Sequence, residues 1–140
     1  ILERFRTLFP QYQTISEFIM RVFIIDDNQI DLLISRKLLL KSNADIDVKE
    51  YSQAQKALQE IQSSEDDRPD IILLDLNMPT MDGWGFLDGL KAAQIQSGFK
   101  VYVLTSSLDD RDRTRAQNYA VVEGYLTKPL NDTVIQGIIQ

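Results

Sequence analysis

Three acidic residues stand at positions where carboxylates could do chemistry. Asp26 and Asp27 directly follow the apolar run 22–25, and Asp75 directly follows the aliphatic run 71–74. Short apolar runs bounded by turn residues are typical of strands that are buried on both faces of a parallel sheet. In open α/β sheets the ligand crevice lies beyond the carboxyl ends of the strands, so these acids are site candidates.

Carboxylates that gather at neighbouring strand ends repel one another, and a bound cation would compensate them. The chain contains no histidine and no cysteine, so a metal would have to be held by oxygen ligands. A few carboxylates with carbonyl and water oxygens suit Mg²⁺. We therefore expect Mg²⁺ as the cofactor, held by Asp26, Asp27, Asp75 and the backbone carbonyl of Asn77.

Two further polar residues end the later strands of the pattern. Thr105 ends the apolar run 101–104, and Lys128 follows the run 121–126 and precedes Pro129. A hydroxyl and an ammonium can bind phosphoryl oxygens, while an ionised Asp75 can attack phosphorus without a general base. Alone, each such residue is more often a cap, a turn residue or a solvated charge. Their convergence predicts a site for phosphoryl transfer.

The elements that must position these residues alternate along the chain. The apolar patterns predict five strands and five helices, which imply a mostly parallel sheet covered on both faces, with right-handed crossovers. We favour a flavodoxin-like, doubly wound (βα)5 fold of strand order 2-1-3-4-5, because this order places the first and third strands side by side. Asn28 or Asp31 could cap the first helix. The expected strands cover 22–25, 46–51, 71–75, 101–104 and 121–126, and the expected helices cover 30–40, 54–61, 84–93, 108–119 and 131–140.

Length and composition restrict the function classes. A chain of 140 residues with 44% hydrophobic residues fits one domain with a real core. The net charge of −6 argues against nucleic acid or a membrane surface as the direct partner. Residues 1–19 read differently from the rest, so we expect an added or upstream extension over 1–19 and the functional domain over 20–140. A reducing, cytoplasmic setting is the expectation for a chain without cysteine.

The residues Asp26, Asp27, Asp75, Thr105 and Lys128-Pro129, with Met-Pro-Thr-Met-Asp-Gly at 78–83, resemble the motif of response-regulator receiver domains. These domains belong to two-component signalling, and the resemblance over 20–140 is to the chemotaxis-type, single-domain members. It implies that Asp75 is the phospho-acceptor, that Asp27 binds the metal directly and that Asp26 binds it through water. It also implies that Thr105 is the switch hydroxyl, Lys128 the phosphate-binding lysine and Tyr125 the switch aromatic residue.

The resemblance also implies a signalling role. Asp75 would accept a phosphoryl group from a sensor histidine kinase or a histidine phosphotransfer protein, and the only catalysis would be the domain's own Mg²⁺-dependent phosphorylation and dephosphorylation. Thr105 would move toward the phosphoryl group, and Tyr125 would turn inward behind it. The face formed by 108–119, 121–126 and 131–140 would then bind a downstream protein. A phosphorylation-dependent dimer is also compatible with the resemblance.

Two other classes of protein use related features. A haloacid-dehalogenase-like phosphohydrolase needs a second acid two residues after its nucleophile, but Asn77 stands there and an amide cannot exchange the proton. A phosphorylation-independent adaptor on the same fold would be marked by loss of the acidic pair, the acceptor or the lysine. None of these is lost, so the phosphoacceptor interpretation is favoured over both.

Overall fold

The computed structural model describes residue 4 and residues 7–8, 10–11, 19–106 and 109–139. The expected extension over 1–19 falls mostly outside this part of the chain and stays a prediction. No helix in the described ranges has both the length and the apolar character needed to cross a membrane.

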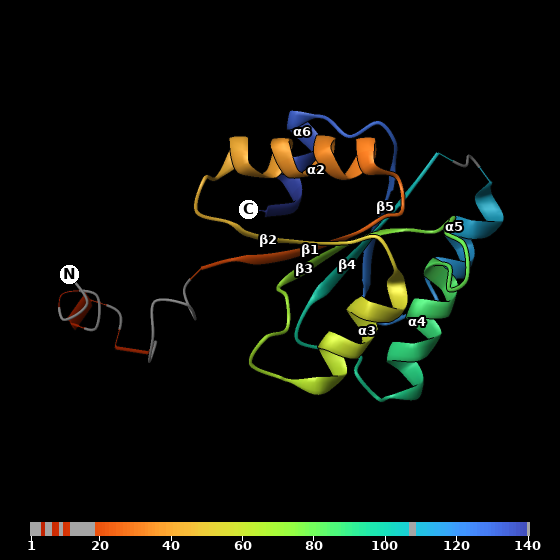
Figure 1. Ribbon diagram of the computed structural model, residues 1–140, viewed down its shortest axis with the longest axis horizontal. Helices are drawn as coiled ribbons and strands as arrows, with labels where there is room; N and C mark the ends of the chain where they lie inside the picture. The colour runs from red at the N-terminus through yellow and green to blue at the C-terminus, as the bar shows by residue number, and fades with distance from the viewer. Residues whose placement is uncertain (1–3, 5–6, 9, 12–18, 107–108, 140) are drawn as a thin grey trace.

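Strands and helices alternate through the described residues from Arg21 onward (Figure 1), as the sequence predicts. The sheet is five-stranded and parallel, with the order β2-β1-β3-β4-β5. This confirms the expected doubly wound fold. The elements are β1 (Arg21–Ile25), α2 (Gln29–Ser42), β2 (Asp47–Tyr51), α3 (Ala54–Ser63), β3 (Ile71–Asp75), α4 (Gly83–Ala92), β4 (Lys100–Thr105), α5 (Asp110–Ala116), β5 (Val122–Thr127) and α6 (Asp132–Ile139).

The helices form a layer on each side of the sheet (Figure 1). One layer contains α3, α4 and α5, and its core packs around Phe23, Ile72 and Phe86. The other contains α2 and α6, and its core packs around Ile24 and Leu73. Because both faces are covered, the central strand β3 is buried along its whole length, as its uninterrupted aliphatic run predicts.

Side chains that accept hydrogen bonds from backbone N–H groups mark the starts of four helices, and one of them is Asn131, which accepts from the Val134 N–H before α6. The Asn28 side chain accepts from the N–H groups of Ile30 and Asp31 at the start of α2. Asn28 is therefore the cap, and Asp31 lies in the first helical turn, where an acid interacts favourably with the helix dipole. Asp82 and Asp109 cap α4 and α5 in the same way.

The helix expected over 108–119 is shorter in the structure. Residue 108 lies outside the described residues, and Asp109 is the cap of α5 and not part of its body. At the other end, Gln117 and Asn118 donate to carbonyls three residues back, at 3.2 and 3.1 Å. This tight spacing ends the α-helix at Ala116, because bonds to the third residue back form turns and not α-helix.

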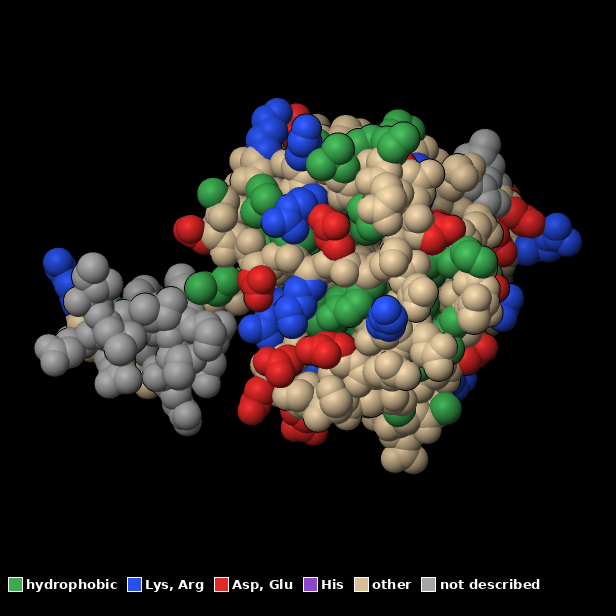
Figure 2. All heavy atoms as spheres, viewed as in Figure 1, with side chains coloured by type: hydrophobic (Ala, Val, Ile, Leu, Met, Phe, Trp, Pro, Cys, Tyr) green, Lys and Arg blue, Asp and Glu red, His purple; other side chains and the backbone are tan. Residues whose placement is uncertain are grey.

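The surface mixes acidic and basic side chains, with hydrophobic side chains exposed along the top of the view over α2 (Figure 2). Ile30, Leu33 and Ile34 of α2 are exposed, and their spacing places them on one side of the helix. Single exposed apolar residues are normal, but three on one helical face form a small apolar surface beside the start of α2.

Candidate functional site

The strand register brings the predicted site residues to one edge of the sheet. Ile25 of β1 pairs with Leu74 of β3, so Asp26 and Asp75 follow at the same level of neighbouring strands. Asp75 pairs in turn with Leu104 of β4, and Thr105 is the next residue. Asp26, Asp75 and Thr105 are 1%, 6% and 0% exposed, so polar groups are buried here at the carboxyl edge.

Asp26, Asp27 and Asp75 form an acidic cluster that fits a metal ion. One carboxylate oxygen from each lies within 4.8 Å of the others. Asp27 is exposed while the other two are buried, so the cluster opens to solvent on one side. Three carboxylate oxygens without nitrogen or sulfur ligands suit Mg²⁺. Asn77 lines the same pocket, but the role of its carbonyl as a ligand stays a prediction.

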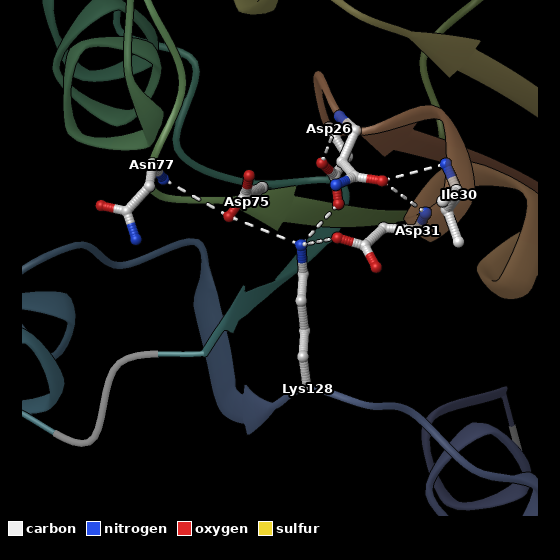
Figure 3. Close-up of polar contacts among 7 residues, drawn as sticks. Asp26, Ile30, Asp31, Asp75, Asn77 and Lys128 are labelled. Atoms are coloured by element: carbon white, nitrogen blue, oxygen red, sulfur yellow. Dashed lines mark hydrogen bonds and ion pairs between the residues drawn. The ribbon is translucent and has the colours of Figure 1, made fainter.

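Lys128 supplies the positive charge opposite these acids (Figure 3). Its Nζ lies 2.7 Å from Asp26 Oδ2 and 2.9 Å from Asp31 Oδ2, and both contacts are hydrogen bonds. The distance from Nζ to Asp75 Oδ1 is 3.7 Å, which is an ion pair without a hydrogen bond. The Lys128 backbone N–H donates to the Thr105 carbonyl at 2.9 Å, which ties the start of the loop after β5 to the end of β4.

The site perturbs the ionisation of its own groups. Burial, and then the neighbouring Asp26 carboxylate, raise the pKa of Asp75 to about 6, against the opposing effect of Lys128. Burial lowers the pKa of Lys128, but its hydrogen bonds to Asp26 and Asp31 outweigh this effect and leave the pKa above its usual value. Asp75 is thus a carboxylate of increased basicity beside a firmly protonated ammonium group.

The pocket above the sheet edge is open and polar, with a volume of about 450 Å³. It brings together most of the residues that the sequence predicts for the site. Its lining also contains Asp31, which sequence reasoning considered only as a cap. The full lining is Asp27, Asn28, Asp31, Asp75, Asn77, Ser106, Lys128 and Pro129.

Tyr125 lies apart from this pocket, in a groove between α5 and β5. The Arg113 guanidinium carbon lies 5.2 Å from the centroid of the Tyr125 ring. Burial raises the pKa of the Tyr125 hydroxyl, and the Thr105 side chain has a smaller effect in the opposite direction. Tyr125 is therefore close enough to interact with Thr105, but its role as a switch residue stays a prediction.

Gly83 is a positioning residue that the sequence does not reveal. A Cβ at this position would lie 2.7 Å from the Asp75 carbonyl oxygen and 2.8 Å from Leu76 Cα. Its N–H donates to the Leu76 carbonyl at 3.0 Å. The first residue of α4 therefore packs directly on the backbone that carries Asp75, and only glycine leaves room for this approach.

The sheet is parallel and doubly wound, and its carboxyl edge carries clustered carboxylates, a hydroxyl and a lysine. This combination defines a class of α/β domain with a pocket for a phosphoryl group at that edge. The family model of the response regulator receiver domain matches residues 22–140. The chain is 33% identical over 109 residues to the transcriptional regulatory protein PrrA of Mycobacterium tuberculosis, which covers 78% of this chain and 43% of PrrA.

Solved structures agree with this match. A two-component response regulator from Cytophaga hutchinsonii is 27% identical with a TM-score of 0.77, over 86% of this chain and 94% of that chain. The phosphorylated cyanobacterial phytochrome response regulator RcpA is 28% identical with a TM-score of 0.73, over 86% and 91% of the two chains. The chain belongs to the response-regulator receiver domain family, and it is a signalling domain of the two-component type.

Proposed function

We propose that Asp75 is the residue that accepts the phosphoryl group. The observation that carries this proposal is the setting of the Asp75 carboxylate, which is 6% exposed and lies 3.7 Å from the Lys128 ammonium group. A pKa of about 6 leaves this carboxylate mostly ionised at neutral pH and more basic than an ordinary aspartate. Both properties suit a nucleophile toward phosphorus.

The donor would be a phosphohistidine of a sensor histidine kinase or a histidine phosphotransfer protein. An oxygen of Asp75 forms the new bond to phosphorus as the phosphorus–nitrogen bond breaks, and the imidazole leaves with the electron pair. Hydrolysis of the resulting acyl phosphate by water returns Asp75 and releases inorganic phosphate. Asn77 stands where a phosphohydrolase has its acid–base residue, so no side chain at that position can take the proton from the attacking water in the second step.

Asp26, Asp27 and Asp75 would hold Mg²⁺, with the Asn77 carbonyl as an additional ligand. When bound, Mg²⁺ would neutralise charge on the phosphoryl oxygens. Lys128 Nζ is near enough to Asp75 to donate to another phosphoryl oxygen after a small movement. The Thr105 hydroxyl, at the end of the neighbouring strand, would bind a further one.

The readout would be a change in the face formed by α5, β5 and α6. The phosphoryl group carries about −1.5 to −2 charges on three acceptor oxygens, in place of the single charge of the Asp75 carboxylate, so it draws hydrogen-bond donors toward Asp75. Movement of Thr105 would free space for Tyr125, which lies on β5 beside α5. We propose that a downstream protein, or a second copy of the domain, binds this face, and that the domain over 20–140 acts in the cytoplasm.

The test is modification by a small phosphodonor. We expect acetyl phosphate with Mg²⁺ to add one phosphoryl mass to the protein, and beryllium fluoride to change the fluorescence of Trp84, the sole tryptophan. Asp75→Ala should show neither effect. Asp45→Asn is the matched control, because it removes one exposed carboxylate in the turn between α2 and β2, at the other edge of the sheet.

Equal modification of Asp75→Ala would contradict the assignment of the acceptor. Rapid release of phosphate over many turnovers, with no phosphorylated protein accumulating, would contradict the proposed storage of the phosphoryl group on Asp75 and favour a phosphohydrolase.

A further inference from the structure

A fourth acid lies in the phosphoryl pocket and contacts its lysine. The Asp31 side chain places Oδ2 2.9 Å from Lys128 Nζ, and Figure 3 shows it opposite Asp75 across the ammonium group. Asp31 does not belong to the cluster of three carboxylates that could share a metal ion. Its interaction is with the lysine and not with the metal site.

The start of α2 fixes the position of Asp31. Its backbone N–H donates to the Asn28 side chain at 3.1 Å, which places the residue in the first turn of the helix. The Asn28 backbone N–H donates to Asp26 Oδ1 at 2.9 Å, so the same cap is tied to the end of β1. Asp31 and Asp26 are therefore held together as a pair of acceptors on the α2 side of the pocket.

The distances show how Lys128 is shared among the acids. The ammonium group donates hydrogen bonds to Asp26 and Asp31. Asp75 lies farther from it, at 3.7 Å, without a hydrogen bond. A phosphoryl group on Asp75 would bring new acceptor oxygens and additional negative charge to that side. To donate to it at full strength, the ammonium group has to weaken one of its present contacts.

Asp31 is the partner that Lys128 can leave at the lower cost. The Asp31 side chain is 33% exposed, whereas that of Asp26 is 1% exposed. Water can replace the ammonium group at Asp31, but a buried carboxylate that loses its partner stays without compensation.

We propose that Asp31 is a positioning residue for Lys128, and this inference rests on the proposed function of Asp75. Before phosphorylation, Asp31 holds the ammonium group on the α2 side of the pocket. After phosphorylation, the lysine exchanges Asp31 for a phosphoryl oxygen while it keeps Asp26. Asp31 thereby competes with the phosphoryl group for Lys128 and lowers the affinity of the pocket for it.

The experiment is a double-mutant cycle with Asp31→Asn and Lys128→Met. Beryllium fluoride is titrated at saturating Mg²⁺ with Trp84 fluorescence as the signal, and the rate of labelling by acetyl phosphate is measured by intact mass. We expect Asp31→Asn to tighten beryllium fluoride binding about fivefold, within the range that contacting charged groups contribute. Asp31→Glu, which keeps the charge, should bind closer to the unsubstituted protein, and Asp45→Asn should not differ from it.

The Lys128→Met background distinguishes an effect of Asp31 that acts through the lysine from direct repulsion between the Asp31 charge and the bound anion. If Asp31 acts through the lysine, Asp31→Asn in this background should change neither the labelling rate nor the binding constant. The same gain in both backgrounds would overturn the proposal, because Asp31 would then only repel the anion. The absence of any gain from Asp31→Asn would overturn it as well. Labelling of Asp75→Ala, in contrast, would contradict the proposed function of Asp75 as the phosphoryl acceptor.

Discussion

Replacement of Asp75 by asparagine should make the metal-free protein more stable at neutral pH. Folding buries this carboxylate next to Asp26 and raises its pKa from an ordinary value of 3.8 to about 6. A carboxyl group whose pKa is raised by folding is less favourable when ionised in the folded state than in the unfolded chain. The amide keeps an oxygen that can accept the Asn77 N–H, which now lies 3.3 Å from Asp75 Oδ1.

The size of the effect follows from the shift in the Asp75 pKa. At 1.36 kcal/mol per pKa unit, the ionised carboxylate costs about 3 kcal/mol of unfolding free energy above pH 6. We expect Asp75→Asn to recover half of this cost or more, so its free energy of unfolding should increase by about 1.5 to 3 kcal/mol. In a domain of this size, that corresponds to a rise of roughly 4 °C in Tm for each kcal/mol.

The pH dependence has a definite sign. Below about pH 4 the acid is protonated in both the folded and unfolded states, so the cost is absent. It grows as pH rises from 4 to 6 and is complete above 6, because the folded state holds its proton over this window while the unfolded state does not. The stability difference between Asp75→Asn and the unsubstituted protein should therefore open between pH 4 and 6.

Thermal and urea denaturation in EDTA, at several pH values, measure this difference. Asp45→Asn should stay within about 0.5 kcal/mol of the unsubstituted protein, as exposed substitutions usually do. Saturating Mg²⁺ should narrow the gap, since a cation stabilises the protein that has more carboxylates. A variant that is less stable at pH 7.5, or whose gain is the same at pH 4, would refute the reasoning about burial and repulsion.

Three other substitutions test contacts around the site. Gly83→Ala places a Cβ 2.7 Å from the Asp75 carbonyl oxygen, so we expect a loss of about 1 to 3 kcal/mol in urea denaturation and slower acetyl phosphate labelling. Unchanged stability would contradict the close approach. Asn28→Ala removes the cap of α2 and should cost about 1 kcal/mol, whereas Asn28→Asp keeps an acceptor and should cost less. Arg115→Gln removes the guanidinium group 4.3 Å from the Trp84 ring centroid. It should change Trp84 emission and cost at most about 1 kcal/mol, with labelling of Asp75 unaltered; slower labelling would show that the Arg115 contact reaches the site.

The fold could be predicted because its strands differ clearly from its helices in sequence. The run that ends in Asp75 is aliphatic at every position since both faces of β3 are covered, and such a strand has no helical periodicity. The same rule places Asp26 and Asp75 at one edge, because neighbouring parallel strands end on the same side. Local pattern was therefore enough for the parallel strands, and the choice of a common strand order that places β1 beside β3 was enough for the acidic cluster.

Contacts that depend on how the helices pack against distant parts of the chain could not be predicted in this way. Asp31 lies 97 residues from Lys128, and its position in the first helical turn suggests only an interaction with the helix dipole. Gly83 looks like an ordinary glycine at the start of a helix, and its contact with the Asp75 backbone depends on how α4 packs on β3. The groove that contains Tyr125 could not be predicted either, because an aromatic residue in a strand is equally compatible with simple packing.

The hydrogen bond between Lys128 and Asp26 joins residues that are 102 positions apart. Lys128 follows β5, which pairs with β4 at the far side of the sheet from β2, so the position of the lysine depends on that pairing. Long-range pairings of this kind form slowly, because the entropy of closing the loop has to be lost before the contact stabilises the chain. During synthesis, the acids at the ends of β1 and β3 would thus exist before the cation that compensates them. A chain that has not yet placed its fifth strand has no complete pocket, so competence to receive a phosphoryl group would coincide with completion of the fold.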